Sequence, residues 1–226
     1  MLSKNILSSV LARCLITGGD FAEIFEEDTI DTSISILNGK VENSISGRTH
    51  GIGIRIFKGL KSVYAYTNNT LNALLDTVQK AALALGELKE DISVVLNEKV
   101  IYNNNPIIYI PSSISAQKKI EVMKCGYKAA KEYSDEITQV SVGYLDKEQN
   151  ILIANTEGLL TEDKRVRTRL MISSVASANG ENQTGYEGPG AHKGFELFKD
   201  IDPEYYGREA SRVAQTMLHA KNCPAG

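Results

Sequence analysis

The strongest constraint on the fold is a stretch of alternating apolar residues at 33–66. Apolar side chains occupy every second position before the pair Asn38-Gly39, and again from Ile52 to Ile56. Alternation with a period of two is typical of a strand with one buried face. Asn-Gly favours a tight hairpin, because both central residues of a type I′ turn need positive φ. The stretch therefore predicts consecutive antiparallel strands, which we call the meander.

Helical periodicity flanks the meander on both sides. Over 3–17 and over 70–85, apolar residues recur three and four positions apart, and glycine follows each segment. This spacing places the apolar side chains on one side of a helix, and a glycine just beyond is a frequent helix end. We expect both helices to pack on the sheet, with a short strand at 21–27 between the first helix and the meander.

The same order of elements recurs later in the chain. Its predicted elements are a helix at 116–133, strands at 140–144 and 151–153, a long strand through 166–172, and a helix from Asp202-Pro203 whose buried stripe is Tyr206, Ala210, Val213, Ala214 and Met217. The connection before it is irregular, although 92–96 is compatible with a strand. The predicted fold class is α+β: a duplicated helix–antiparallel meander–helix unit, mostly antiparallel sheet with helices packed on it. Its halves would cover about 1–90 and 115–222.

The two halves differ in one segment. From Asn155 to Asp202 the chain is longer than the matching path from Asn38 to Thr70 by about 15 residues. The excess falls within 178–195, which contains five glycines and one proline and is therefore expected to be a loop. Loops held by a rigid scaffold often carry function, and a plain connecting loop is the alternative.

Composition excludes several classes of protein. Hydrophobic residues make up 42% of the 226 residues and charged residues 23%, as in a globular protein with a core. A net charge of −3 gives no general attraction to nucleic acid or to an anionic membrane. No window is apolar enough for a membrane span, and the N-terminal apolar run forms one helical face rather than a signal-peptide core. Three widely spaced cysteines argue against a disulfide framework, so we expect a cytoplasmic protein.

We assign no catalytic group to this chain. Its three histidines include no His-Glu-x-x-His pair that would present two imidazoles to zinc, and no Gly-x-Ser-x-Gly elbow occurs. His50 is expected to mark a turn before a strand, and His219 to lie solvated or capping near a helix C-terminus. His192, in the glycine-rich segment, is the histidine we consider for ligand contact.

Three arginines share one face of the long strand through 166–172. Arg165, Arg167 and Arg169 alternate with apolar residues and threonine. One interpretation is a solvated sheet face, paired with the strand edge that carries Glu23, Glu26 and Glu27. The other is a surface that binds carboxylate or phosphate, because a guanidinium group matches the geometry of such oxyanions.

Short segments along essentially the whole chain resemble the TldD/PmbA family. They are Gly18-Gly19-Asp20-Phe21-Ala22-Glu23, His50-Gly51-Ile52-Gly53-Ile54-Arg55, Tyr64-Ala65-Tyr66-Thr67, Asn155-Thr156-Glu157-Gly158, Arg167-Thr168-Arg169 and Gln183-Thr184-Gly185-Tyr186-Glu187-Gly188. In order and spacing they are similar to the N-terminal domain of that family. The last segment looks more like its TldD branch.

The resemblance implies a cytoplasmic zinc metalloprotease subunit that cleaves peptides or unfolded polypeptides, a family also linked to modulation of DNA gyrase. Its members form homo- or heterodimers that enclose a cavity. It also implies a His-Glu-x-x-x-His zinc helix shortly beyond the segment Lys221–Gly226, which this chain does not contain. Residues 1–226 would thus be an N-terminal domain without the catalytic domain, and no catalytic residue or metal ligand is assigned here; zinc is expected in the full-length protein.

We expect this domain to wall the cavity and guide substrate, with contacts from Tyr186, Glu187, Gly188, His192, Arg167 and Arg169. Extended substrate could add as a strand to a sheet edge. The expected partners are a peptide or unfolded protein and a TldD/PmbA-type subunit, with no nucleic acid and no membrane. The alternative is a non-catalytic dimerisation or peptide-binding module.

Overall fold

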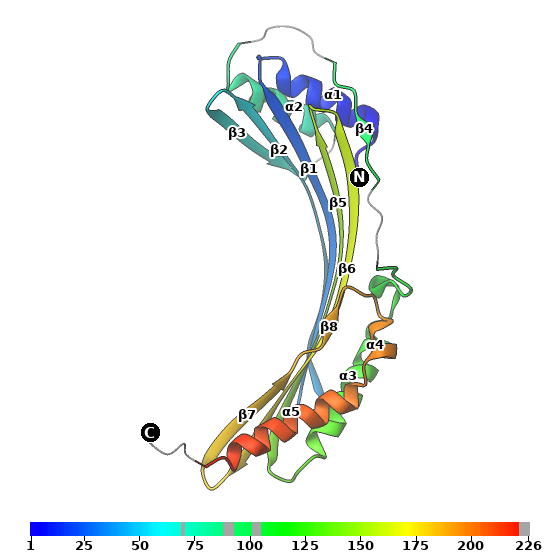
Figure 1. Cartoon of the computed structure of the whole chain (residues 1–226), viewed down its shortest axis with the longest axis vertical. Helices are drawn as coiled ribbons and strands as arrows, with labels where there is room; N and C mark the ends of the chain where they lie inside the picture. Colours follow the sequence, from blue (N-terminus) through cyan, green and yellow to red (C-terminus); the bar gives the residue numbers. More distant parts are fainter. Residues whose placement is uncertain (69–70, 88–92, 101–104, 222–226) are drawn as a thin grey trace. The chain divides into compact units, whose positions relative to one another are not determined.

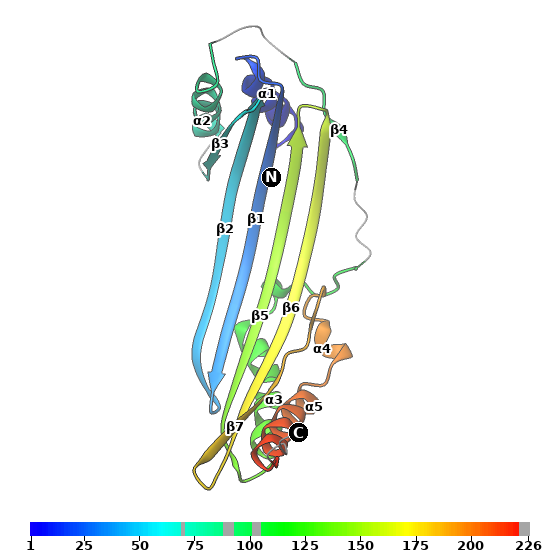
Figure 2. The same cartoon turned by 60° about the vertical axis from the view of Figure 1, so that its left-hand side comes forward.

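The computed structural model describes residues 1–68, 71–87, 93–100 and 105–221. These residues form an eight-stranded, mostly antiparallel sheet with five α-helices packed on it, which confirms the predicted α+β class (Figures 1 and 2). The strand order is β3-β2-β1-β5-β6-β4, and β7 and β8 both pair with β6. The short β4 runs parallel to its neighbour β6.

The elements have the following bounds. They are α1 (Lys4–Leu15), β1 (Phe21–Leu37), β2 (Lys40–Lys58), β3 (Lys61–Thr67), α2 (Leu71–Leu83), β4 (Asn97–Glu98), the 3₁₀ turn η1 (Pro111–Ser113), α3 (Ala116–Lys131), β5 (Ile137–Asn155), β6 (Leu159–Ala178), β7 (Glu181–Glu187), β8 (Gly190–Ala191), α4 (Leu197–Asp200) and α5 (Pro203–Leu218).

Strand continuity departs from the prediction. The strands expected at 140–144 and 151–153 are one strand, β5, and the strand at 21–27 continues into the meander as β1. The polar residues between the two expected strands stay in β5 because they have partners: Asp146 binds Lys119, and Glu148 accepts a hydrogen bond from the Ser112 backbone N–H. His50 lies within β2 and not in a turn, and its ring contacts Glu26.

The structure contradicts two further predictions, both for connecting segments. The strand considered at 92–96 is not formed at 93–96, where β4 begins only at Asn97, and Ile92 lies outside the described residues. The segment 178–195 is not one irregular loop. It contains β7, which pairs with β6 from Ile172↔Glu187 to Ala178↔Glu181, and the short β8.

Asn-Gly turns form two of the hairpins: one joins β1 to β2, and the other joins β6 to β7. Asn38 and Gly39 have φ of 46° and 80°, and Asn179 and Gly180 have φ of 52° and 80°. Both pairs therefore have the positive φ values of a type I′ turn, which is predicted at the first pair but not at the second. In the first half, β3 ends at Thr67 and α2 begins at Leu71. In the second half, β7 ends at Glu187 and α5 begins only at Pro203, so the excess length of this half lies at 188–202.

Contacts divide the chain into two units, and each is built from separate parts of the sequence. Unit 1 contains Met1–Thr29, Arg48–Asn104 and Gln149–Lys164. Its core joins α1 and α2 to the strands through aliphatic side chains such as Leu7, Leu11, Ile54 and Leu74, which are fully buried. The helical stripes predicted in this unit are the faces that pack on the sheet.

Unit 2 contains Ile30–Gly47, Asn105–Glu148 and Arg165–Gly226, and its core joins α3 and α5 to the strands. Helix α5 begins as predicted, because the Asp202 side chain accepts a hydrogen bond from the Glu204 backbone N–H. Its buried face differs from the prediction, since Met217 is 49% exposed while Gly207 is buried. A side chain at Gly207 would collide with the carbonyl oxygen of Gly126 in α3. The two helices thus meet backbone to backbone.

Candidate functional site

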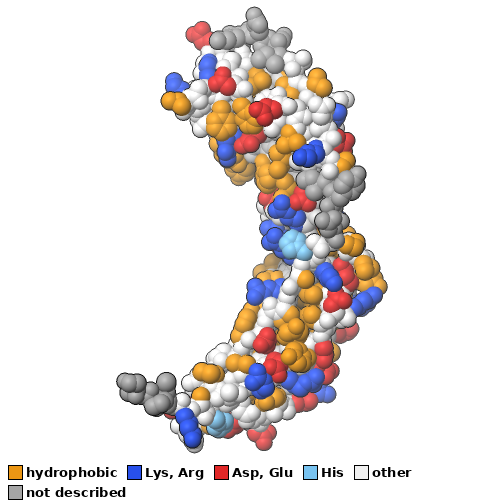
Figure 3. Space-filling model, in the orientation of Figure 1, with side chains coloured by type: hydrophobic (Ala, Val, Ile, Leu, Met, Phe, Trp, Pro, Cys, Tyr) orange, Lys and Arg blue, Asp and Glu red, His pale blue; other side chains and the backbone are white. Residues whose placement is uncertain are grey.

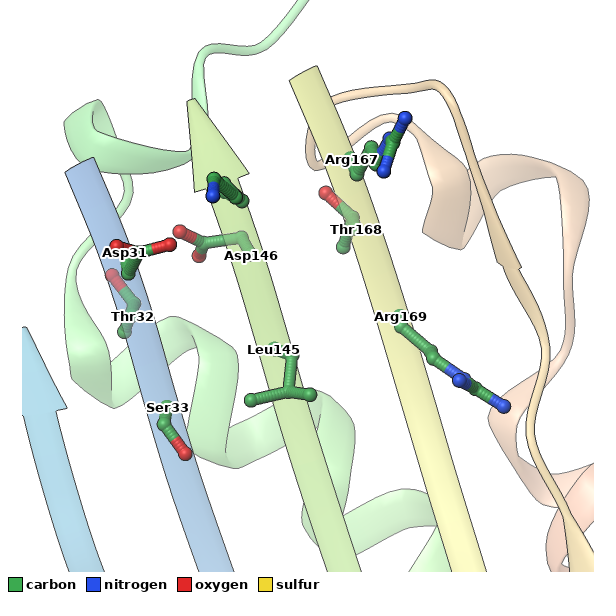
Figure 4. Close-up of a pocket in the computed structure, with 9 residues that line it drawn as sticks. Asp31, Thr32, Ser33, Leu145, Asp146, Arg167, Thr168 and Arg169 are labelled. Atoms are coloured by element: carbon green, nitrogen blue, oxygen red, sulfur yellow. The ribbon is translucent and has the colours of Figure 1, made fainter. Parts of the chain in front are cut away.

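The candidate site lies on the face of the unit 2 sheet opposite α3 and α5. Along β6, Arg165, Arg167 and Arg169 are exposed, whereas Val166 and Thr168 are buried, as the alternation predicted. Buried positions face the helices, so strand geometry projects the arginines from the other face. Figure 4 shows Arg167 and Arg169 on β6 with both side chains pointing away from β5, toward the segment that contains β8.

Arg167 is held by His192. The Arg167 Nε–H donates to His192 Nε2 over 2.9 Å. A guanidinium group can only donate, so this ring nitrogen must be the unprotonated acceptor and the ring is neutral in this contact. The histidine is positioned by β8, where Thr168 pairs with Ala191, and by the hydrogen bond from the Leu170 backbone N–H to the Pro189 carbonyl.

Arg169 is held by Tyr186 in a similar way. Its terminal nitrogen donates to the Tyr186 hydroxyl over 3.2 Å. Glycine at 188 makes room for this contact, because a Cβ there would lie 2.5 Å from the Tyr186 hydroxyl and 3.0 Å from the Arg169 guanidinium. A Cβ at Gly190 would lie 3.0 Å from Arg169 Cγ. The glycines of this segment therefore make room for side chains that lie across the backbone.

Two depressions adjoin these arginines within unit 2. One, of about 250 Å³, is lined by Asp31, Thr32, Ser33, Leu145, Asp146, Lys147, Arg167, Thr168 and Arg169 (Figure 4). The other, of about 460 Å³, is lined by Arg167, Thr168, Arg169, Gly188, Gly190, Ala191 and His192. The arginines line both depressions, so a ligand in either one would meet them.

The surface around the site is positive although the chain as a whole is acidic. Arg167 and Arg169 line both depressions, Lys147 lines the one of about 250 Å³, and Asp31 is the exposed carboxylate among the lining residues. Figure 3 shows Lys and Arg side chains gathered beside a histidine. The balance favours an anionic ligand group over a cationic one.

A buried polar network lies behind the site and was not predicted from the sequence. Lys119 in α3 and Asp146 in β5 are 2% and 3% exposed, and Lys119 Nζ lies 2.5 Å from Asp146 Oδ2. Among the described residues, Asp146 Oδ1, the Tyr144 hydroxyl and Thr168 Oγ1 have no hydrogen-bond partner. Burial, followed by the nearby Asp146 carboxylate, raises the pKa of Tyr144, so this phenol stays protonated.

The signal for this network was present in the sequence. Lys119 is four positions before Met123, and Asp146 is two positions after Tyr144, so each lies in phase with buried neighbours. Polar residues at core-facing positions predict buried partners elsewhere in the chain. The sequence could indicate that both side chains are buried, but not that they contact each other.

The structure brings together five of the six predicted site residues: Tyr186, Gly188, His192, Arg167 and Arg169. Glu187 is separated from them. It follows Tyr186 in β7, so alternation places it on the opposite face, the face from which Gly185 meets α5. Arg167 and Arg169 contact His192 and Tyr186 rather than the acidic strand, whose Glu23 lies 3.5 Å from Arg55.

The other histidines have their own partners. His50 Nε2 lies 3.0 Å from Glu26 Oε1 in unit 1. His219 caps α5 as expected and contacts Glu136, whose pKa is lowered by hydrogen bonds from His219 and Gln215. Within the described residues no group of three His, Cys, Asp or Glu side chains could hold a metal ion. In the same residues, no helix combines the length and apolarity that crossing a membrane requires.

Two protein-family models match most of the chain. Residues 22–85 match the PmbA/TldA metallopeptidase domain 1, and residues 109–218 match the PmbA/TldA metallopeptidase central domain. A metalloprotease of Methanothermobacter thermautotrophicus is 28% identical over 212 residues. A metalloprotease TldD homologue of Haemophilus influenzae is 26% identical over 217 residues. The chain aligns over 92% of its own length but spans 45% of each relative.

Solved structures share the fold. A Bacteroides thetaiotaomicron protein described as a modulator of DNA gyrase superposes with a TM-score of 0.77 at 16% identity, over 99% of this chain and 52% of that protein. A Thermotoga maritima protein of the same description gives 0.73 at 18% identity, over 91% and 46%. TldE of Thermococcus kodakarensis gives 0.65 at 16% identity, over 87% and 44%.

Proposed function

Because the chain belongs to the PmbA/TldD metallopeptidase family, we propose that it forms the cavity-lining and substrate-guiding part of a TldD-like zinc metalloprotease. The substrates would be peptides or unfolded polypeptides. The observation that carries this proposal is the cluster of Arg167, Arg169, Tyr186 and His192 on the helix-free face of the unit 2 sheet. An extended peptide lying beside β8 would meet the cluster and could pair with a strand edge.

We assign the zinc ion and the hydrolytic step to residues outside this chain. The described residues do not fit a zinc site, because Glu26, Arg167 and Glu136 engage the three histidines and no suitable group of ligands is present among them. The metal and the catalytic groups would belong to the part of the relatives' length that this chain does not span. The contribution proposed for the chain is binding and orientation of the substrate.

We further propose that a second TldD/PmbA-type subunit completes the cavity, as a homo- or heterodimer in the cytoplasm. Free thiols at Cys14 and Cys125 are compatible with a reducing compartment. Size-exclusion chromatography with light scattering would give the oligomeric state, and cell fractionation the location. The alternative function is a dimerisation or peptide-binding module that never takes part in hydrolysis, which is favoured by the lack of a group of metal ligands in the described residues.

The substrate-guiding proposal is tested by binding. A fluorescently labelled, permanently unfolded polypeptide should bind the 226-residue chain, and hydrogen exchange should show protection at 167–169 and 186–192. Tyr186→Ala should weaken binding several-fold, because the variant removes the contact that holds Arg169. Tyr205→Ala is the matched control, since Tyr205 is similarly exposed on α5 (53% against 51%). Equal binding by both variants, or protection elsewhere, would contradict the proposal.

Peptidase activity separates the two functions. In a form of the protein that hydrolyses peptides, Tyr186→Ala should reduce turnover while the thermal unfolding midpoint stays the same. If the protein binds peptide but no form of it, alone or with a TldD/PmbA-type subunit, hydrolyses peptide in the presence of zinc, the binding-module alternative is correct.

A further inference from the structure

We propose that Arg167 and Arg169 bind a carboxylate of the peptide substrate, either its C-terminus or an Asp or Glu side chain. This inference rests on the proposed function, because it assigns a chemical preference to the same surface. The shared chemistry is a planar oxyanion, which a guanidinium group can bind through two parallel N–H donors.

Arg167 and Arg169 differ from four other arginines of the chain in the type of partner that they contact. Arg48, Arg55, Arg208 and Arg212 each lie within 4 Å of a carboxylate oxygen, in ion pairs of 2.6–3.7 Å. In contrast, the contacts of Arg167 and Arg169 in the described residues are an imidazole nitrogen and a phenol hydroxyl. Both contacts are with neutral acceptors, so they orient the guanidinium groups without neutralising their charge.

Contacts within unit 2 hold the two guanidinium groups in place. The pairing of β8 with β6 positions His192, and the glycine at 188 lets Tyr186 lie against Arg169. Arg167 and Arg169 are two residues apart on one strand face, a separation of roughly 7 Å along the strand. Their side chains lean to the same side, toward β8 (Figure 4). Orientation before binding lowers the entropy cost of binding a ligand.

The surface next to the arginines also has room for a peptide side chain. The depression of about 250 Å³ beside the arginines contains Leu145, which is 41% exposed, and Lys147 on the same strand. An apolar substrate side chain could cover Leu145 while a carboxylate reached the arginines, and Lys147 would add to the attraction. Asp31, the exposed carboxylate at this rim, would disfavour an acidic group there, so the carboxylate is assigned to the β8 side.

Nucleic acid phosphates could meet the same cations, but the site fits them less well. Single-stranded nucleic acid is usually bound by positive grooves with aromatic rings on which bases stack. Here Tyr186 is the aromatic residue in contact with the arginines, and its hydroxyl is already used by Arg169. The chain also has a net charge of −3. A peptide carboxylate is therefore the ligand we assign.

The test measures fluorescence anisotropy with the 226-residue chain and four forms of one unstructured peptide. The forms have a free or amidated C-terminus, each with glutamate or glutamine at the internal acidic positions. Removing the carboxylate that is recognised should weaken binding about 5- to 10-fold, and less so in high salt. The two modifications separate C-terminal from side-chain recognition.

Variants assign the effect to the arginines. Arg167→Ala/Arg169→Ala should bind all four peptides with the weaker affinity, and Arg167→Lys/Arg169→Lys should recover part of the preference. Arg208→Ala/Arg212→Ala, on α5 of the same unit, is the control and should keep the full preference. Circular dichroism would verify that each variant is folded.

The outcomes separate this inference from the proposed function. Equal binding of all four peptides, with protection still at 167–169 and 186–192, overturns carboxylate recognition and leaves substrate guiding intact. Absence of peptide binding at this face overturns both. Tighter binding of a single-stranded oligonucleotide that displaces the peptide would assign the surface to phosphate and also overturn the inference.

Discussion

Each unit buries at least one carboxylate in its strands, and Glu26 of unit 1 and Asp146 of unit 2 have different surroundings. Glu26 in unit 1 is 1% exposed and contacts the Leu2 backbone N–H at 2.7 Å, His50 at 3.0 Å and the N-terminal amine at 3.6 Å. Asp146 in unit 2 has one oxygen on Lys119, while Oδ1 has no hydrogen-bond partner among the described residues.

The partners of the two carboxylates differ in their exposure to solvent. The partners of Glu26 are partly exposed, with 34% of the His50 side chain accessible, so water can share in solvating them. Lys119 and Asp146 are both enclosed, and Asp146 lines the depression of about 250 Å³ together with Arg167 and Arg169. Unit 2 therefore keeps a fully buried ion pair directly behind its candidate site, and unit 1 has no counterpart in the described residues.

The largest expected effect comes from breaking the buried pair. Asp146→Ala leaves the Lys119 ammonium buried without its partner and should lower the free energy of unfolding by about 3–5 kcal/mol. Glu26→Ala should cost about 1–3 kcal/mol, because its former partners can reach water. Urea unfolding measures both. Equal losses would remove the distinction between the units, and Lys119→Met/Asp146→Leu should recover much of the loss.

The second prediction compares a glycine of unit 2 that is packed against a helix with one that is not. In unit 2 a Cβ at Gly185 would collide with the carbonyl oxygen of Ala210 in α5. Gly185→Ala should therefore destabilise the protein by about 1–3 kcal/mol, as overpacking does. Gly47→Ala is the control in the same unit, since nothing lies within 4 Å of its Cβ position. Thermal unfolding compares the two, and similar midpoints would argue against close packing of β7 on α5.

The two units also differ in the exposure of their cysteines, which can be measured without changing the stability of the protein. Burial raises the pKa of Cys14 in unit 1 to about 12, whereas Cys125 in unit 2 is exposed. In a Cys223→Ser background at a pH of about 8, a thiol reagent should label Cys125 quickly and Cys14 only after denaturation, since the thiolate is the reactive form. Rapid labelling of two thiols in the native protein would show that the unit 1 core opens easily.

The smallest effect is expected from a surface ion pair of unit 1. The hydrogen bond from Arg48, at 2.6–2.7 Å, lowers the pKa of Asp28. The folded pKa lies below the unfolded value of about 3.9, so this pair stabilises the fold above that pH and loses its effect as the pH falls through the folded pKa. Asp28→Asn should flatten the acid end of a stability–pH curve slightly, and an unchanged curve would show that the pair contributes nothing.

Local signals predicted the parts of the fold that depend on neighbouring residues. The Asn38-Gly39 hairpin, the start of α5 at Asp202 and the alternation of arginines on β6 were all predictable. The hairpin at Asn179-Gly180 carried the same signal and was overlooked because the glycine content of 178–195 suggested a loop. The continuity of β5 could not be predicted, since Asp146 and Glu148 depend on partners far away in the sequence.

The candidate site was predictable as residue types but not as contacts. Guanidinium chemistry singled out Arg167 and Arg169, and the glycine-rich segment singled out His192 and Tyr186. Their contacts follow from β8 and β7 pairing with β6, a register that no local pattern specifies. Glu187 was grouped with them because it belongs to the segment Gln183–Gly188 that resembles the TldD/PmbA family, and strand alternation separates it from them.

The strand order has a consequence for anyone who wishes to divide this protein. β1 pairs with β5, so a fragment that ends near residue 90 would lose the neighbour of a 17-residue strand. The bared amide groups would offer a template for intermolecular pairing, and such a fragment should precipitate or form fibrils. Excision at the middle of the sequence would thus convert a folded chain into an aggregating one, whatever the sequence similarity of the halves.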